Sequence, residues 1–350
     1  MIKVLIVDDS VLIRKVLTEI FSSEPSIKVV GTAADPYIAR EKIKSLAPDV
    51  ITLDIEMPKM DGITFLRNLM RLRPMPVVMI STLTQKGAPS TLEALELGAV
   101  DYIGKPSADN PELLTEYAQE IVDKVKMASV ANIGRLEEQA NRPVVKSVPT
   151  IPKQGLNKEA FIVIGASTGG TEAIREFLCM LPGDTPPIVI TQHIPPVFSA
   201  SFAKRIDSLI PQSVSEAHDG DKIMPGHIYI APGDRHFSVV QKGGHFYCKV
   251  YSGERVNLHK PSVEVLFDSI TAIPSLAKRS IGIMLTGMGA DGAKAMLRLK
   301  QAGCYTIVQD KNSSVVWGMP GAAVELGAAD TILPLNQIAS HVVSRLKRAK

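Results

Sequence analysis

The sequence VLIVDDS, residues 4–10, decides the fold of the first part of the chain. It is a short apolar run that stops abruptly at two aspartates, as a buried strand does at the edge of a sheet. Similar apolar runs occur at residues 29–33, 50–53, 77–80 and 101–103. Stretches with helical spacing separate and follow them, at residues 11–21, 36–45, 62–72, 88–97 and 113–127. This alternation predicts βαβ units and a parallel sheet covered on both faces.

A second alternating region opens at Phe161. Its apolar runs lie at residues 162–164, 188–190, 280–285, 305–309 and 331–333, and its helical stretches at 171–181, 199–209, 263–273 and 293–302. Between His227 and Tyr251 the alternation has a period of two, and Lys242-Gly243-Gly244 is a turn signal. We therefore predict an antiparallel hairpin in this part of the second region.

The predicted fold class is α/β, with two domains. Residues 1–125 form an N-terminal (βα)5 domain, and residues 160–347 form a doubly wound, mostly parallel sheet domain that includes the hairpin. Residues 126–159 mix charges, Asn, Gln and Pro without periodicity, so we interpret them as a linker with a possible helical start.

Composition excludes several classes of protein. The length of 350 residues fits two domains at roughly 150 residues each, and a hydrophobic share of 45% is ample for packed cores. The net charge of +3 and the single short basic run, at residues 345–350, do not indicate a nucleic-acid partner. The three cysteines are widely spaced, which favours a reducing compartment. With no run of ~20 apolar residues, we expect a cytoplasmic protein without membrane insertion.

Polar side chains stand where the strands of the first domain end. Asp8 and Asp9 follow the first strand, Asp54 the third, Ser81 the fourth and Lys105 the fifth. Ligands of parallel α/β sheets bind at this edge, and a cluster of carboxylates there suits a hard dication such as Mg²⁺. A single acid at a strand end can instead cap a helix or stay solvated, but the complete set favours a binding site.

Three motifs of the first domain resemble the receiver domain of two-component response regulators. They are VLIVDDS at residues 4–10, DIEMPKMDG at 54–62 and GKP at 104–106, and the resemblance covers residues 1 to about 125. It implies that Asp54 accepts a phosphoryl group from a histidine kinase.

The same resemblance implies roles for the neighbouring residues. Asp9, Asp54 and the backbone carbonyl of Glu56 would bind Mg²⁺, with Asp8 helping through water. The switch residues would be Ser81, Tyr102 and Lys105.

The sequence GASTGG, residues 165–170, joins a strand to a helix in the second domain. Its G-x-S-x-G pattern exposes Ser167 on a tight turn, where it can act as a nucleophile. A dinucleotide site is the rival interpretation, since glycine-rich turns also bind phosphates. The spacing G-x-x-x-G-G differs from G-x-G-x-x-G, and the next strand is followed by Gln192-His193 rather than an acid, which favours the nucleophile.

A nucleophilic serine needs a base and an orienting carboxylate. Of seven histidines, His193 directly follows an apolar parallel strand, next in order after the serine strand; His236 is the second choice. Asp291 lies in the glycine-rich sequence LTGMGADG, residues 285–292, although it could equally be the N-cap of the following helix. The order Ser167, His193, Asp291 differs from that of the α/β-hydrolases.

Four segments of the second domain resemble the catalytic domain of the chemotaxis protein-glutamate methylesterases, the CheB family. They are GASTGG at residues 165–170, TQHIPP at 191–196, IAPGDRH at 230–236 and LTGMGADG at 285–292. The resemblance implies a hydrolase with Ser167, His193 and Asp291 as catalytic residues and no cofactor in this domain. Backbone N–H groups near Thr168 or Met288 would hold the oxyanion.

The family resemblance also implies substrates and partners. The enzyme would hydrolyse γ-glutamyl methyl esters on the cytoplasmic domains of chemoreceptors, releasing methanol, and deamidate selected glutamines. A chemotaxis histidine kinase would be the phosphodonor. We expect the unphosphorylated receiver to cover the active-site cleft and phosphorylation to activate the enzyme.

Two other functions remain open at the level of sequence. The second domain could only bind a protein or a nucleotide, or it could be an esterase for small molecules.

Overall fold

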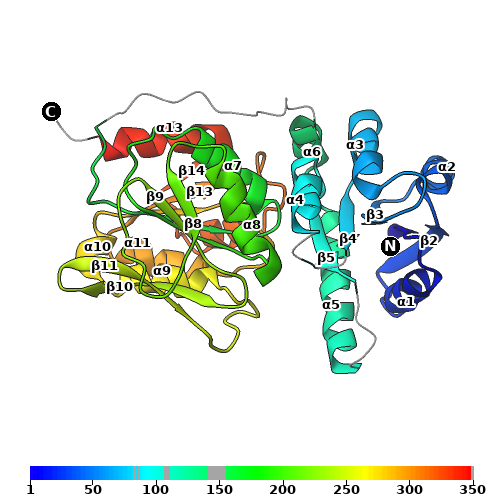
Figure 1. Cartoon of the computed structure of the whole chain (residues 1–350), viewed down its shortest axis with the longest axis horizontal. Helices are drawn as coiled ribbons and strands as arrows, with labels where there is room; N and C mark the ends of the chain where they lie inside the picture. Colours follow the sequence, from blue (N-terminus) through cyan, green and yellow to red (C-terminus); the bar gives the residue numbers. More distant parts are fainter. Residues whose placement is uncertain (82–83, 85–86, 106–110, 141–154, 348–350) are drawn as a thin grey trace. The chain divides into compact units, whose positions relative to one another are not determined.

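The computed structural model describes residues 1–81, 84, 87–105, 111–140 and 155–347. The chain divides into two compact units, Met1–Pro143 and Val144–Lys350 (Figure 1). Both are α/β units, so the predicted fold class is confirmed. Among the described residues, none of the helices is both long and apolar enough to cross a membrane.

The first unit is built on a five-stranded sheet in the order β2-β1-β3-β4-β5. Every neighbouring pair is parallel, so all the carboxyl ends lie at one edge. Most of the strand residues are buried because helices cover both faces. The strands are β1 Ile2–Val7, β2 Ile27–Ala33, β3 Val50–Asp54, β4 Val77–Ser81 and β5 Asp101–Gly104.

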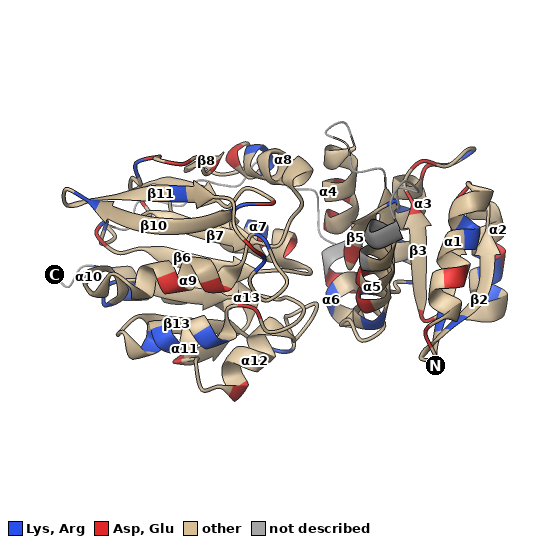
Figure 2. Cartoon of the chain, turned by 90° about the horizontal axis from the view of Figure 1, so that it is seen from below, with Lys and Arg blue, Asp and Glu red and all other residues tan. Residues whose placement is uncertain are grey.

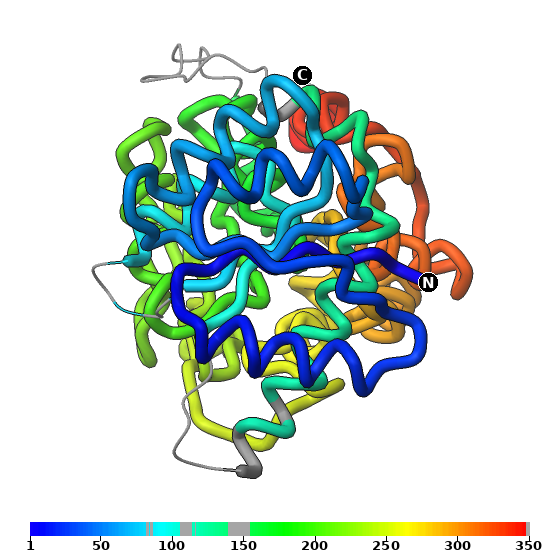
Figure 3. Tube along the Cα trace, turned by 90° about the vertical axis from the view of Figure 1, so that its right-hand side faces the viewer, coloured from blue at the N-terminus to red at the C-terminus, as the bar shows by residue number. Residues whose placement is uncertain are grey.

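Helices cover both faces of this sheet (Figure 3). On one face α1 packs against α5; α2, α3 and α4 lie on the other, where α6 packs against α3. Side-chain caps fix several helix starts: Asp35 accepts hydrogen bonds from the first amides of α2, and Asp61 caps α3. The helices are α1 Val11–Ser22, α2 Pro36–Leu46, α3 Gly62–Leu72, α4 Ala88–Glu96, α5 Pro111–Ala128 and α6 Ile133–Ala140.

The segment predicted as a linker, residues 126–159, begins as ordered structure. Helix α5 continues to Ala128, and α6 follows it with Leu136 fully buried. Residues 141–154 of this segment lie outside the described residues.

The second unit contains a seven-stranded sheet in the order β14-β13-β12-β6-β7-β9-β8, parallel at every pair. The central position of β6 brings the serine turn to the middle of the carboxyl edge, beside the ends of β7 and β12. The strands are β6 Ile162–Ala166, β7 Ile188–Gln192, β8 Ser213–Glu216, β9 His227–Ile230, β12 Ile281–Met284, β13 Tyr305–Gln309 and β14 Thr331–Leu333.

Two helical layers enclose this sheet (Figure 1). One contains α7 Gly170–Cys179, α8 Pro196–Asp207 and α13 Leu335–Leu346. The other contains α9 Val263–Thr271, α10 Pro274–Ala277, α11 Ala293–Gln301 and α12 Met319–Glu325. Acidic residues of α9 face basic residues of α11 (Figure 2), where Arg298 pairs with Glu264 and Asp268, each at 2.7 Å.

The antiparallel hairpin is present but shorter than predicted. It consists of β10 His236–Lys242 and β11 His245–Tyr251, joined by Gly243 and Gly244, and packs against α9. The period-two segment at residues 227–230 does not belong to it: this segment is β9, which pairs in parallel with β7 and β8. The sequence analysis missed β8, a four-residue edge strand with only one buried residue.

Candidate functional site

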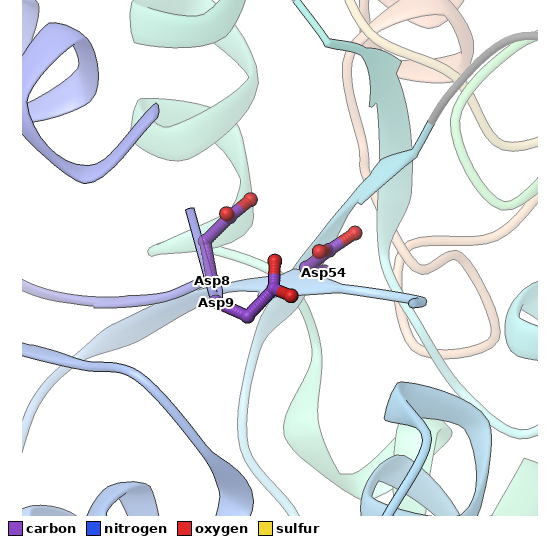
Figure 4. Close-up of side chains that lie close together, drawn as sticks. All are labelled: Asp8, Asp9 and Asp54. Carbon is purple, nitrogen blue, oxygen red and sulfur yellow. The ribbon is translucent and has the colours of Figure 1, made fainter. Parts of the chain in front are cut away.

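Three carboxylates meet at the carboxyl edge of the first sheet. Asp8 and Asp9 follow β1, and Asp54 is the last residue of β3 (Figure 4). One oxygen from each lies within 4.8 Å of the others. Asp8 and Asp54 are each only 1% exposed, whereas Asp9 is exposed. Such a set of oxygen ligands fits a hard cation such as Mg²⁺.

Lys105 supplies a positive charge to this cluster. Its Nζ lies 2.7 Å from Asp54 Oδ2 and 3.2 Å from Asp8 Oδ2. Burial nevertheless raises the pKa of Asp54 to about 6, against the lowering effect of Lys105, and it also raises the pKa of Asp8. One ammonium therefore does not fully offset the cost of burying two carboxylates, and a bound dication would favour their charged forms.

Glu56 and Ser81, two other predicted receiver residues, lie beside this cluster. A cavity of about 590 Å³ is lined by Asp9, Asp54, Glu56 and Ser81 among others. The side chain of Glu56 is exposed, and its backbone N–H donates to Asp54 Oδ1 at 3.3 Å.

The two remaining switch candidates are buried. Ser81 Oγ shares a hydrogen bond of 3.3 Å with Thr91 Oγ1 of α4. Tyr102 is 6% exposed, and Lys124 Nζ lies 5.2 Å from its ring centroid. Lys124 also pairs with Asp101 at 3.2 Å, a contact that the sequence analysis missed.

In the second unit, the structure brings Ser167, His193 and Asp291 together. They lie beyond the ends of β6, β7 and β12, three adjacent strands. The Nδ1 atom of His193 lies 3.0 Å from Ser167 Oγ, and its Nε2 lies 2.8 Å from Asp291 Oδ2. The three residues thus form one continuous hydrogen-bonded chain, although the first and the last are 124 positions apart in the sequence (291 − 167).

The chain of contacts determines where the proton of His193 lies. An ionised carboxylate only accepts hydrogen bonds, so Nε2 carries the proton and donates a hydrogen bond to Asp291. The Nδ1 atom is then free to accept from the hydroxyl of Ser167. Ser167 is 8% exposed and the side chain of His193 is 10% exposed.

Asp291 is held as a carboxylate by a dense set of donors. Burial alone would raise its pKa, but the hydrogen bonds from His193, Asn257 and Ser262 lower it to about 2. Ser262 Oγ and Asn257 Nδ2 each lie 2.8 Å from Oδ1, and the Val263 amide lies 2.7 Å from Oδ2. These donors, two from the loop before α9 and one from the first residue of that helix, were not predicted from the sequence.

The glycines of the serine turn are explained by close packing. A Cβ at Gly170 would lie 2.1 Å from Gln192 Oε1, and one at Gly169, where φ is +74°, would lie 2.8 Å from Val315 Cβ. The Nε2 of Gln192 donates a hydrogen bond to the carbonyl of Ser167 at 2.8 Å, and this bond stabilises the turn. Only glycine fits these positions without displacing a neighbour.

The two predicted oxyanion segments lie side by side. A Cβ at Gly287 would be 2.9 Å from Ser167 Cβ, and Thr286 Oγ1 donates to the carbonyl of Thr168 at 3.0 Å. Thr168 is buried and Met288 is half-buried. The loop that carries Met288 is therefore in contact with the nucleophile turn.

The second-choice base, His236, occupies a different place. It is 2% exposed on β10, and its Nε2 lies 2.7 Å from the backbone carbonyl of Glu254. It is therefore a buried residue hydrogen-bonded to the backbone.

Comparison with known proteins assigns both units. The sequence model of the CheB methylesterases matches residues 162–342, and that of the response regulator receiver domain matches residues 4–118. A solved structure, the CheB methylesterase catalytic domain of Thermotoga maritima, is 36% identical with a TM-score of 0.52, covering 53% of this chain and 98% of its own. The chain is thus a response regulator with a methylesterase-type effector domain.

Relatives match along the whole chain. The protein-glutamate methylesterase/protein-glutamine glutaminase of Hydrogenovibrio crunogenus is 50% identical, covering 99% of this chain and 99% of its own. A namesake from Hahella chejuensis is 54% identical over 97% of this chain and 95% of its own. The chain belongs to the family of the protein-glutamate methylesterases/protein-glutamine glutaminases, with an N-terminal receiver domain.

The burial of charged Asp291 predicts a pH-dependent stability. Folding lowers its pKa from 3.8 to about 2, so its contribution is complete above about pH 4 and is lost as the pH falls towards 2. Asp291→Asn should be less stable than wild type at pH 6, and this difference should shrink by about 2 kcal/mol once the carboxyl is protonated. Thermal unfolding between pH 6 and pH 2 measures the trend, with Glu325→Gln, which changes an exposed residue at the end of α12, as control. A constant difference throughout would contradict a charged Asp291.

Proposed function

We propose that the chain hydrolyses γ-glutamyl methyl esters on the cytoplasmic domains of chemoreceptors, with glutamate and methanol as products. The observation that supports this most directly is the hydrogen-bonded chain from Ser167 through His193 to Asp291. The names of its relatives support glutamate methyl esters of proteins as substrates, and the resemblance to the chemotaxis methylesterases points to the receptors. A protein that acts on these receptor domains works in the cytoplasm.

Ser167 is the nucleophile of this proposal. Its Oγ attacks the ester carbonyl while Nδ1 of His193 takes the hydroxyl proton. The resulting imidazolium is stabilised by the carboxylate of Asp291, which also keeps the second proton on Nε2. His193 then returns a proton to the leaving methoxide, and methanol departs from the acyl-enzyme.

Water completes the turnover by the same route. His193 accepts a proton from the water that attacks the acyl group, and Ser167 leaves as the restored hydroxyl. Backbone N–H groups near Thr168 or Met288 hold the negative oxygen in both steps, since their loops pack together at the nucleophile. The same acyl chemistry deamidates a glutamine side chain, with ammonia leaving in place of methanol.

The first unit is proposed as the phosphoacceptor of a chemotaxis histidine kinase. Asp54 accepts the phosphoryl group, and Lys105 lies within reach of that group because it already contacts the Asp54 carboxylate. The three clustered carboxylates of Asp8, Asp9 and Asp54 fit Mg²⁺. By the family resemblance, Asp9, Asp54 and the backbone carbonyl of Glu56 would bind the ion, and Asp8 would help through water. When bound, the ion would neutralise charge on the transferring phosphoryl. Ser81 and Tyr102 remain the proposed switch residues.

Removal of the nucleophile should abolish the esterase reaction. For Ser167→Ala we expect methanol release from methylated receptor membranes to fall about 10⁴-fold, because the covalent route is lost. Thermal unfolding checks that the variant is folded. A rate of methanol release in the variant equal to that of wild type would refute the serine mechanism. If the wild-type protein hydrolyses only simple esters and not methylated receptors, it is a small-molecule esterase.

Removal of the phosphoacceptor should abolish labelling. Asp54→Asn leaves an amide that cannot form the acyl phosphate, so incorporation from a small phosphodonor should disappear while basal methanol release persists. Asp49→Asn, which changes an exposed aspartate that accepts from the Lys3 amide, is the matched control. Undiminished labelling of Asp54→Asn would disprove the assignment.

We further propose that phosphorylation relieves inhibition by the receiver unit. Deletion of residues 1–140 should then raise basal methanol release about tenfold, a usual size for coupling between sites. The catalytic domain of the Thermotoga maritima relative has been solved by itself, which supports the use of this fragment. The truncated enzyme should no longer respond to phosphodonor, and a truncation without any gain in basal rate would contradict inhibition.

A further inference from the structure

A tight turn at residues 256–259 contacts two members of the Ser167–His193–Asp291 chain. The Val256 amide donates to the His259 carbonyl at 3.0 Å, and the His259 amide returns the bond at 2.9 Å. These paired bonds close the turn and fix the directions in which its side chains leave the backbone.

Asn257 contacts Asp291, the carboxylate of the hydrogen-bonded series. One hydrogen of its Nδ2 goes to Asp291 Oδ1 at 2.8 Å, and the other goes to Glu264 Oε2 at 2.7 Å. Glu264 lies in the first turn of α9, so the amide ties Asp291 to that helix. With Oδ1 held in this way, Oδ2 remains directed at His193.

His259 contacts the imidazole of His193. Its ring stacks on that of His193, with centroids 3.7 Å apart and an interplanar angle of 14°. A half-buried aromatic ring thus covers one face of the His193 imidazole. Rotation of the His193 ring about its Cβ–Cγ bond would break this stacking together with both of its hydrogen bonds.

The backbone of the turn is strained. Asn257 and Leu258 both have positive φ, 51° and 68°. Asparagine tolerates this conformation, but leucine does not favour it. Leu258 is 84% exposed, so burial of its side chain does not compensate. Strain of this kind is found where neighbouring contacts impose it, often at functional sites.

From these contacts we propose that the turn at residues 256–259 is a positioning element of the hydrolytic site. Asn257 orients the carboxylate of Asp291, and the ring of His259 holds the imidazole of His193 in line with Ser167. Both are positioning residues that act through their neighbours. The proposal rests on the proposed role of the Ser167–His193–Asp291 chain.

Four variants of the full-length protein test this role. His259→Phe keeps a flat ring, whereas His259→Leu keeps apolar volume without one. Asn257→Gly keeps the positive φ but removes the amide. Leu258→Ala changes the exposed residue of the same turn and is the matched control.

Two measurements are made on each variant. The first is kcat and KM for methanol release from methylated receptor membranes with phosphodonor. The second is the nuclear magnetic resonance spectrum of the His193 ring nitrogens in protein with isotope-labelled histidine, assigned by loss of the signal in His193→Gln. This spectrum reports the tautomer independently of any substrate.

For His259→Leu and Asn257→Gly we expect kcat to fall about tenfold with little change in KM, since misplacement of reacting groups acts on the chemical step. His193 should change from one Nε2–H tautomer to a mixture. His259→Phe and Leu258→Ala should stay within about twofold of wild type. An unchanged kcat and tautomer in His259→Leu and Asn257→Gly, or an equal loss in Leu258→Ala, would overturn the proposal.

Failure of the proposed function gives a different result. If wild type releases no methanol, the substrate assignment fails, while the tautomer of His193 in the four variants still decides the role of the turn.

Discussion

The hydrogen bond between His193 and the buried carboxylate of Asp291 is the interaction on which the second unit depends. A charge without solvent is costly unless donors surround it. Here the donors are a ring N–H from the end of β7, and an amide side chain, a hydroxyl and a backbone N–H from residues 257–263. Satisfying this one carboxylate therefore fixes β7, β12 and the loop before α9 relative to one another, and Ser167 meets a histidine whose tautomer is already set.

The same architectural rule serves both units. Parallel strands deliver their last residues to one edge, so residues distant in sequence meet there without any long-range sequence signal. In the first unit the edge gathers carboxylates around an ammonium; in the second it gathers a hydroxyl, an imidazole and a carboxylate. One chain thus combines a site suited to a cation and phosphate with a site suited to acyl transfer.

Most of the strands and the residues at their ends could be predicted from the sequence, because apolar runs that stop at polar residues carry that information locally. The segment at residues 227–230 was misplaced into the hairpin because its sequence, His-Ile-Tyr-Ile, alternates, whereas in the structure Tyr229 is buried together with its two isoleucine neighbours. Asn257, His259 and Ser262 could not be found in this way. They lie in a loop, and what makes them important is contact with Asp291 and His193, which exists only after the loop packs on the sheet.

The pairing of α9 with α11 connects the protein surface to Asp291. Arg298, which is 42% exposed, lies 2.7 Å from Glu264, whose other oxygen accepts from Asn257 on its way to Asp291. The side chains of Glu264 and Asn257 therefore connect the partly exposed guanidinium of Arg298 to the interior carboxylate. Dissolved salt weakens the outer pair more than the inner bonds, so the electrolyte around the protein is part of the environment in which the buried carboxylate of Asp291 is held.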